Sequence, residues 1–420
     1  MVNGFFLLFF CPFFLHLHLM KDTYSCEMLA NKTRGVLCSQ HIARLIEDKH
    51  IEATDVSDGI RIEQIQPNTL DLRIGLGTVA ISGMSFLPHG KGVEETVVAL
   101  GIARQEKLGQ FLLVPGQVLT VPLAERLSLP AGVRGRCNPK STAGRLGLFV
   151  RVIAEGGAAY DQIPDGYEGP LWAQISTICF PVILQVGDCL TQIRFFLGDT
   201  RLSPDEVDLL IRSYGRLVRH DAPVTPAADE VSKALSLVGL ASHGASSPSP
   251  NDLRFSANLE GVGRVAFSNS PWASTPIVYA QKGRFAPERY WVSRRADRGG
   301  IIAHPSVLHL LASREYITIP PEVCGEMIAI QEGAGEFRAH FAGFFDSGFG
   351  FGSPSKIVME IVPYGTPVFL HHGQALFRFE LHKNLDRPAF LYGMGPAGNS
   401  YQGQDLRLAK QFLPWPDRGR

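Results

Sequence analysis

One stretch of this 420-residue chain occurs twice. Residues 125–135 match residues 315–325 at a constant offset, with Glu, a Ser or Thr, Pro, Val and a closing Gly in the same order. Further along, residues 181–187 match residues 367–373 in the same way. A repeat that keeps turn residues and strands in one order indicates two copies of one module rather than a single large domain. The chain is long enough for each copy to bury its own core.

Short apolar or alternating runs, broken by Gly and Pro, predict the secondary structure. Frequent turns with little helix favour an all-β sandwich or barrel. Two amphipathic helices are expected beside the strands, one with Ser39 as its N-cap and one over residues 203–217. We therefore predict an all-β chain of tandem barrel or jelly-roll modules with a few short helices. The predicted strands of the first copy cover residues 69–75, 111–114, 118–122, 171–176, 182–184 and 192–196.

Changes in composition divide the chain into four parts. Residues 1–36 include a Phe-rich run at 5–20 that no Lys or Arg precedes and that is short for a membrane span. We expect this N-terminal extension to lie outside the fold, with Met20 or Met28 as the real start. Residues 219–250, rich in Ala, Ser, Pro and Gly, are predicted to be a linker. It separates a first module at 37–218 from a second at 251–420.

The overall charge excludes some partners. The chain has 40 basic and 40 acidic residues, so nothing global points to nucleic acid or to a membrane surface, and any anion site must be local. Its seven cysteines form no Cys-x-x-Cys pair. Their odd number and wide spacing favour a reduced, cytoplasmic protein over a disulfide framework.

Residues 138–147 are the candidate binding loop. Lys140, Ser141, Thr142 and Arg145 place two cations and two hydroxyls close to glycines. Such a loop can surround a phosphate chain with backbone and side-chain donors. Composition alone leaves a solvated basic turn equally open.

The sequence Asn-Pro-Lys-Ser-Thr-Ala-Gly-Arg-Leu-Gly at 138–147 resembles the Arg-Ser-Ser-x-x-Arg-Leu-Gly motif of dCTP deaminases. That family shares its fold with trimeric dUTPases, and its Asn-Pro-Lys-Ser form looks like the double-length bacterial type. Residues 66–75 resemble the family's early strand, and residues 401–404 resemble its C-terminal closing segment. The resemblance, which covers roughly residues 37–414, implies a dCTP deaminase that forms dUTP and ammonia. It also implies a homo-oligomer, either a trimer or a pseudo-trimeric arrangement of the tandem modules.

Each copy carries half of the site that this resemblance implies. The first has the loop, but Gln174 stands where the family has a catalytic Glu; the second has lost the loop, but Glu360 stands at the aligned position. Deamination without a metal needs a group that takes a proton from water and later delivers one to ammonia, which a carboxylate can do and an amide cannot. We therefore expect a composite site with Glu360, Ser141 and Arg145 as its catalytic residues.

The resemblance also implies the nucleotide contacts. Ser141 would orient the attacking water together with a backbone carbonyl from Ala154 or Ala342. Asp346 is expected either to meet the deoxyribose or to cap its turn. A C-terminal arm would close over the nucleotide and exclude water. The expected binding residues are Lys140, Thr142, Ala154, Ala342, Asp346, Tyr401, Gln402, Gln404 and Lys410.

No resident metal is expected. Zinc-dependent deaminases need Pro-Cys-x-x-Cys, which this sequence lacks. Mg²⁺ is expected to arrive as the dCTP complex, since it touches phosphates more than protein.

Two other functions remain open. One is a dUTP diphosphatase, alone or combined with deamination, in which Asp161 or Asp165 would activate water at the α-phosphate. The other is a deoxynucleotide-binding protein without turnover.

Overall fold

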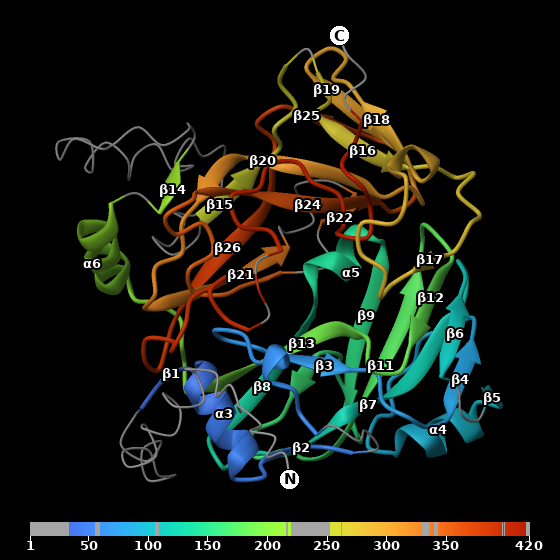
Figure 1. The fold of residues 1–420 in the computed structure, drawn as a ribbon, viewed down its shortest axis with the longest axis vertical. Coiled ribbons are helices and arrows are strands. Elements are labelled where there is room, and N and C mark those ends of the chain that lie inside the picture. Colours follow the sequence, from blue (N-terminus) through green and yellow to red (C-terminus); the bar gives the residue numbers. More distant parts are fainter. Residues whose placement is uncertain are drawn as a thin grey trace, which may run out of the picture.

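The computed structural model describes residues 33–54, 59–105, 109–215, 217–219, 253–261, 263–329, 336–339, 343–396, 398 and 400–416. The run at 5–20, nearly all of the predicted linker and Ala342 lie outside these residues. In Figure 1 the first half of the chain forms the lower set of sheets and the second half the upper set, with few and short helices. The prediction of an all-β chain of tandem modules is confirmed.

The first half builds two main sheets and the larger part of a small third one. The first sheet contains β1 (Gly35–Val36), β3 (Leu70–Arg73), β8 (Val133–Pro139), β10 (Gln162–Ile163) and β13 (Cys189–Leu197). The second contains β2 (Ile51–Ala53), β4 (Val79–Ser82), β5 (Ala103–Gln105), β7 (Val118–Ser128), β9 (Leu148–Ala154) and β11 (Glu168–Thr177). The third contains β6 (Gln110–Leu113), β12 (Val182–Gln185) and β17 (Ile277–Val278).

The second half repeats this plan. Its largest sheet contains β14 (Val218–Arg219), β16 (Ala266–Asn269), β18 (Trp291–Arg294), β20 (His309–Ile317), β22 (Phe337–Ala339) and β24 (Ser355–Pro363). The next contains β15 (Leu253–Ser256), β21 (Val323–Ala329), β23 (Phe344–Phe345) and β26 (Ala375–Lys383). Strands β19 (Gly300–Ala303) and β25 (Val368–His371) pair with each other.

Strand pairing shows the duplication directly. Strand β7 lies between β4 and β11 in the first half, and β20 lies between β16 and β24 in the second. In the same way β13 pairs with β3 and β8, while β26 pairs with β15 and β21. Equivalent strands therefore hold equivalent positions, as the repeat in the sequence predicts.

Helices connect and cover the sheets. Helix α3 (Ser39–Glu47) has Cys38 as its N-cap, so Ser39, the expected cap, is instead its first helical residue. Helix α6 (Pro204–Tyr214) is capped by the Ser203 hydroxyl, which accepts from the Glu206 N–H. These are the two helices expected from the pattern. Helices α4 (Val93–Ala99) and α5 (Ser141–Arg145) were not predicted, nor were the 3₁₀ turns at Ile62–Gln64 and Pro287–Arg289.

The two halves exchange segments. Val207 and Leu210 of α6 join the core of the second half, although α6 precedes the linker. Conversely, β17 pairs in parallel with β12, and Phe412 packs edge-on against Phe180 of the first half. Burying a Phe side chain contributes roughly 1.5–3 kcal/mol. These contacts join the two halves, so each module needs the other to complete its core.

An ion pair crosses the junction between the halves at equivalent positions of the repeat. Arg136 of β8 donates to both carboxylate oxygens of Glu326 on β21, at 2.9 and 2.8 Å.

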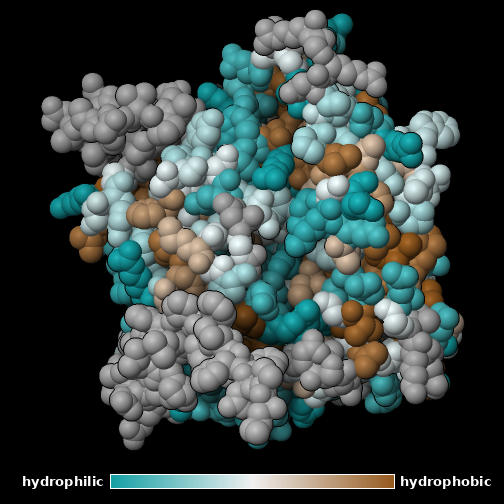
Figure 2. All heavy atoms as spheres, viewed as in Figure 1, coloured by the Kyte–Doolittle hydropathy of each residue, from teal (hydrophilic) through white to brown (hydrophobic). Residues whose placement is uncertain are grey.

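The hydropathy of the surface differs from one flank of the protein to another. Figure 2 shows apolar residues gathered on the right-hand flank, where Figure 1 places β6 and β12, and Leu112 of β6 is 48% exposed.

Candidate active site

The candidate binding loop follows β8 as a short helix rather than an open turn. Lys140 is the N-cap of α5, and its backbone N–H is fixed by the carbonyl of Leu190 on β13. Thr142 and Arg145 are buried. Gly147 ends the loop with a φ of 70°, where a Cβ atom would collide with Cys179. The loop is therefore a packed element, not the solvated turn that composition left open.

The C-terminal arm of the second half meets this loop. The Thr142 hydroxyl is 2.8 Å from the Tyr401 hydroxyl, and Arg145 Nη2 donates to Gln404 Oε1 at 2.9 Å. Arg145 Nη1 donates to the Arg407 carbonyl at 3.0 Å, and its guanidinium lies 4.0 Å from the centre of the Tyr401 ring. Burial lowers the pKa of Arg145, and the neighbouring Tyr401 opposes that shift.

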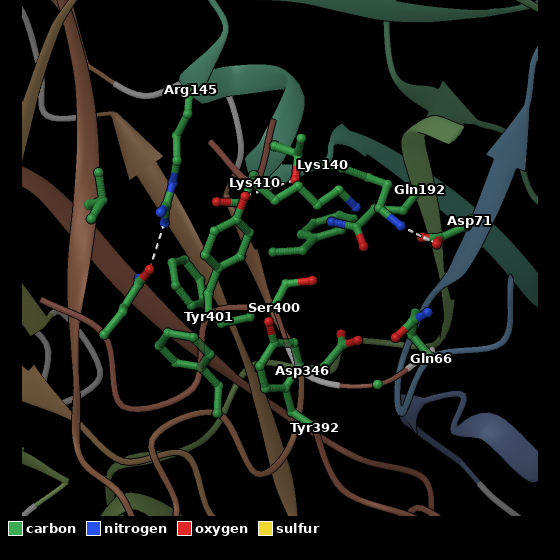
Figure 3. Close-up of a pocket in the computed structure, with 18 residues that line it drawn as sticks. Gln66, Asp71, Lys140, Arg145, Gln192, Asp346, Tyr392, Ser400, Tyr401 and Lys410 are labelled. Carbon is green, nitrogen blue, oxygen red and sulfur yellow. Dashed lines mark hydrogen bonds and ion pairs between the residues drawn. The ribbon is translucent and has the colours of Figure 1, made fainter. Parts of the chain in front are cut away.

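A pocket opens where the loop and the arm meet (Figure 3). Its walls come from both halves of the chain, since β3, α5 and β13 face β23, β24 and the arm. Eight of the residues predicted from the sequence line it: Lys140, Ser141, Thr142, Arg145, Asp346, Tyr401, Gln404 and Lys410. The sequence did not identify the other lining residues, which are Gln66, Asp71, Gln192, Phe344, Phe345, Phe349, Val358, Tyr392, Gly398 and Ser400.

Two lysines place positive charges in one part of the pocket. Burial lowers the pKa of Lys140, but the ion pair with Asp71 more than offsets this, so the net shift is upward. Lys410 has no such partner among the described residues, and burial together with repulsion from Lys140 and Lys282 lowers its pKa to about 8. Two partly buried ammonium groups that repel each other favour an anion between them.

Glu360 stands behind the pocket wall. It is 1% exposed on β24, two residues from Val358, which lines the pocket. Residues two apart on a strand share one face, so Glu360 lies on the pocket side of the sheet. Burial lowers the pKa of Arg145, and the negative charge of Glu360 is one of the smaller influences that oppose this shift.

Gln174 occupies the same place in the first half but a different environment. It lies opposite Thr120 on β7, as Glu360 lies opposite Leu310 on β20. Its Nε2 donates to the Phe86 carbonyl at 3.1 Å, while its Oε1 accepts from the Phe86 N–H at 3.3 Å and from the Tyr160 hydroxyl at 3.0 Å. An ionised carboxylate in its place could accept from the N–H but could not donate to the carbonyl.

The segment that Gln174 holds covers the face that is open in the second half. Phe86 and α4 form a small apolar cluster there, with Val93, Val97 and Ile153 as further members. The counterpart of the pocket is therefore filled by protein.

Three of the described predicted residues, Glu360, Ala154 and Gln402, do not line the pocket. The Ala154 carbonyl accepts from the Gly157 N–H at 2.8 Å, and Ala154 does not line the cavity. Gln402 holds the turn at 348–351, because its side chain bonds the Gly350 N–H and the Gly348 and Phe351 carbonyls. Ala342 lies outside the described residues.

Asp161 and Asp165, considered for a diphosphatase, also lie away from the pocket. Asp161 accepts from Arg151 and the Val152 N–H, and Asp165 accepts from the Gly132 N–H. The carboxylates that line the pocket are Asp71 and Asp346.

Two features are absent from the described residues. These residues contain no group of three or more His, Cys, Asp or Glu side chains that could hold a metal ion. No described helix is long and apolar enough to cross a membrane.

Comparisons with known proteins place the chain in one family. Residues 33–199 match the model of the 2′-deoxycytidine 5′-triphosphate deaminase N-terminal domain, and residues 232–412 match that of its C-terminal domain. A "dCTP deaminase, dUMP-forming" of Methanosphaera stadtmanae is 27% identical over 203 residues, 47% of this chain and 93% of that protein. One from Methanothermobacter thermautotrophicus is 30% identical over 185 residues, 43% of this chain and 84% of that protein.

A solved structure agrees with these sequences. The crystal structure of 2′-deoxycytidine 5′-triphosphate deaminase from Agrobacterium tumefaciens superposes with a TM-score of 0.73 at 30% identity, over 85% of this chain and 97% of that one. Both halves are thus matched, and the matched segments include the loop, the strand of Glu360 and the arm that together surround the pocket. The chain belongs to the dCTP deaminase family.

Proposed function

We propose that this protein deaminates dCTP with water, which gives dUTP and ammonia by hydrolysis of a cyclic amidine C–N bond. The observation that carries the proposal is the meeting of the Lys140–Arg145 loop with the Tyr401–Gln404 arm, held by the Thr142–Tyr401 and Arg145–Gln404 contacts. Neither half supplies both elements.

Glu360 is the proposed acid/base. It takes a proton from water as the oxygen attacks C4 of cytosine and passes that proton to N3. It then takes the proton of the new C4 hydroxyl and passes it to the amino group, which leaves as ammonia while the C4 carbonyl forms. The buried Arg145 cation stabilises the Glu360 carboxylate before the reaction, since opposite charges attract strongly inside a protein. Ser141, which lines the pocket, orients the attacking water.

The remaining pocket residues hold the nucleotide. Lys140 and Lys410 bind phosphate oxygens, with Thr142, Tyr401 and Gln404 as neutral donors, because charge-assisted hydrogen bonds are the strong ones. Asp346 accepts a hydrogen bond from the sugar. Mg²⁺ enters with the phosphates, no zinc takes part, and the protein works in the cytoplasm as a homo-oligomer.

A second candidate combines deamination with release of diphosphate, so that dUMP is the product. The names of the archaeal relatives favour it. In this chain the base that would activate water at the α-phosphate is Asp71 rather than Asp161 or Asp165, because Asp71 lines the pocket beside Lys140.

One assay separates these functions. The full chain is incubated with dCTP and Mg²⁺, ammonia is measured enzymatically, and nucleotides are separated by anion-exchange chromatography. Ammonia in step with dUTP supports the proposal, and ammonia with dUMP and diphosphate supports the second candidate. Binding of dCTP in calorimetry without ammonia would show a binding protein and refute deamination.

A further inference from the structure

Arg194 reaches across the junction of the two halves without touching the pocket. It lies on β13 of the first half, is 0% exposed, and is two residues from Gln192, which lines the cavity. Arg136, on the neighbouring strand β8, also crosses the junction but binds Glu326 instead.

All contacts of the Arg194 guanidinium fall on one wall of the pocket and on the strand behind it. Nη2 donates to the Asp346 carboxylate at 3.0 Å and to the Phe345 carbonyl at 3.2 Å. The guanidinium also lies 4.2 Å from the centre of the Phe344 ring. Nη1 donates to the carbonyl of Gly325, which pairs with Phe345 on the adjacent strand, at 2.8 Å. Phe344, Phe345 and Asp346 all line the pocket, so one buried side chain fixes three consecutive residues of its wall.

The Asp346 carboxylate is held from two sides. Oδ1 accepts from Arg194, and Oδ2 accepts from the Thr69 hydroxyl at 3.2 Å. Burial raises the pKa of Asp346, and the charge of Arg194 opposes that rise. The carboxylate is thus fixed in direction and retains lone pairs that can accept one more hydrogen bond from the pocket.

The chemistry of dCTP selects the group that meets this carboxylate. dCTP has two donor groups, the 4-amino group and the 3′-hydroxyl. In the proposed function the amino group belongs to Glu360, and the phosphates are repelled by a carboxylate. The 3′-hydroxyl is the donor that remains for Asp346.

We propose that Arg194 is a positioning residue, which sets the direction of the Asp346 carboxylate so that it accepts a hydrogen bond from the 3′-hydroxyl of the bound nucleotide. This inference rests on the proposed function for the identity of the ligand. A lysine at 194 keeps the charge but cannot bridge Asp346, Phe345 and Gly325 at once, because it lacks the planar fork of donors.

The test compares dCTP with 2′,3′-dideoxy-CTP, which lacks the hydroxyl. With the wild-type chain we expect kcat/KM to be at least about tenfold lower for the dideoxy nucleotide, since a charged acceptor is left unpaired. In Arg194→Lys we expect this ratio to fall to about twofold or less. Arg136→Lys is the matched control: it disturbs another ion pair across the junction and should leave the ratio unchanged.

Thr69→Val provides a second route if Arg194→Lys fails to fold, because it frees the same carboxylate from its other side and should also reduce the ratio. A double-mutant cycle with Asp346→Asn completes the test, and Arg194→Lys should change the ratio no further on that background. A wild-type ratio near one, or a full ratio that persists in Arg194→Lys and Thr69→Val, would overturn the proposal. If the wild-type chain released no ammonia from dCTP, deamination would fail separately, and the same ratio would be taken from dissociation constants in calorimetry.

Discussion

Gln174 and Glu360 occupy the same position in the two copies of the module, yet Gln174 binds a backbone segment and Glu360 lies behind the wall of a pocket. Gln174 pairs with both polar groups of Phe86, whereas Glu360 is buried two residues from Val358, which lines the cavity. The backbone N–H and carbonyl of Phe86 thus require an amide at position 174. The chain therefore has one proposed catalytic carboxylate, Glu360, for its two modules.

Restoring the acid at position 174 should not create a second site. In Gln174→Glu the carboxylate faces the Phe86 carbonyl without a donor, and a lost buried hydrogen bond of this kind costs about 1–3 kcal/mol. We expect a lower melting temperature and still one nucleotide per chain in calorimetry. Gln162→Glu, on an exposed strand position, is the control and should be neutral. Two nucleotides per chain in Gln174→Glu would contradict this account.

The Tyr401 hydroxyl should contribute to nucleotide binding through Thr142. Tyr401→Phe removes the 2.8 Å contact but keeps the ring under Arg145. Loss of one hydrogen bond of about 0.5–1.5 kcal/mol predicts a dissociation constant for dCTP roughly two- to tenfold higher. Tyr364→Phe, a change at a residue that is 66% exposed, should have no effect. An unchanged dissociation constant in Tyr401→Phe would argue against the arm as part of the site.

Affinity for dCTP should fall as the pH rises through 8. Lys410 has a pKa of about 8 because it is buried and lies near Lys140 and Lys282. A bound phosphate favours the charged amine, so binding is strongest below this pKa and weakens above it. Calorimetry between pH 7 and 9.5 should show this loss in the wild type and a much flatter profile in Lys410→Arg. Equal slopes in both would exclude Lys410 as the titrating group.

The buried pair of Arg73 and Glu125 should dominate the stability of the first half. Both side chains are at most 1% exposed and lie 2.8 Å apart. Arg73→Met leaves the Glu125 carboxylate buried and unpaired with a base, which costs about 3–5 kcal/mol. Urea unfolding should reveal this loss, whereas Arg126→Met, at an exposed pair with 4.0 Å between its atoms, should change stability by less than about 1 kcal/mol. Similar losses in the two variants would show that the buried pair is not special.

The sequence predicted elements whose cause is local. The sequence predicted the strands bounded by Gly and Pro, the capped helix α6 and the loop at 140–145. Each of these is determined by residues that are close together in the sequence. Residues that reach the pocket through strand pairing were missed. Asp71 and Gln192 lie directly opposite each other on β3 and β13, a register that pattern alone does not give. Asp71, an acidic residue within the mainly apolar strand predicted at 69–75, was the signal in the sequence that could have identified this part of the pocket.

Position along a motif also proved a weaker guide than side-chain direction. Gln402 stands between Tyr401 and Gln404, which line the pocket, but its own side chain points into the turn at 348–351. Helix α4 was not predicted, because it is defined by its packing over β11 rather than by a pattern in its own residues. For the same reason, the sequence alone does not reveal that protein fills the counterpart of the pocket in the first half.

The central claim is that Glu360 of the second half performs the proton transfers for a site whose loop comes from the first half. The most direct measurement is the rate of ammonia release from saturating dCTP by Glu360→Gln, beside Glu380→Gln as a control on β26. We predict that Glu360→Gln loses about 10²–10⁴-fold in rate while its dissociation constant for dCTP stays within a few fold of the wild-type value, and that Glu380→Gln keeps its activity. Ammonia release at the wild-type rate by Glu360→Gln would contradict the account.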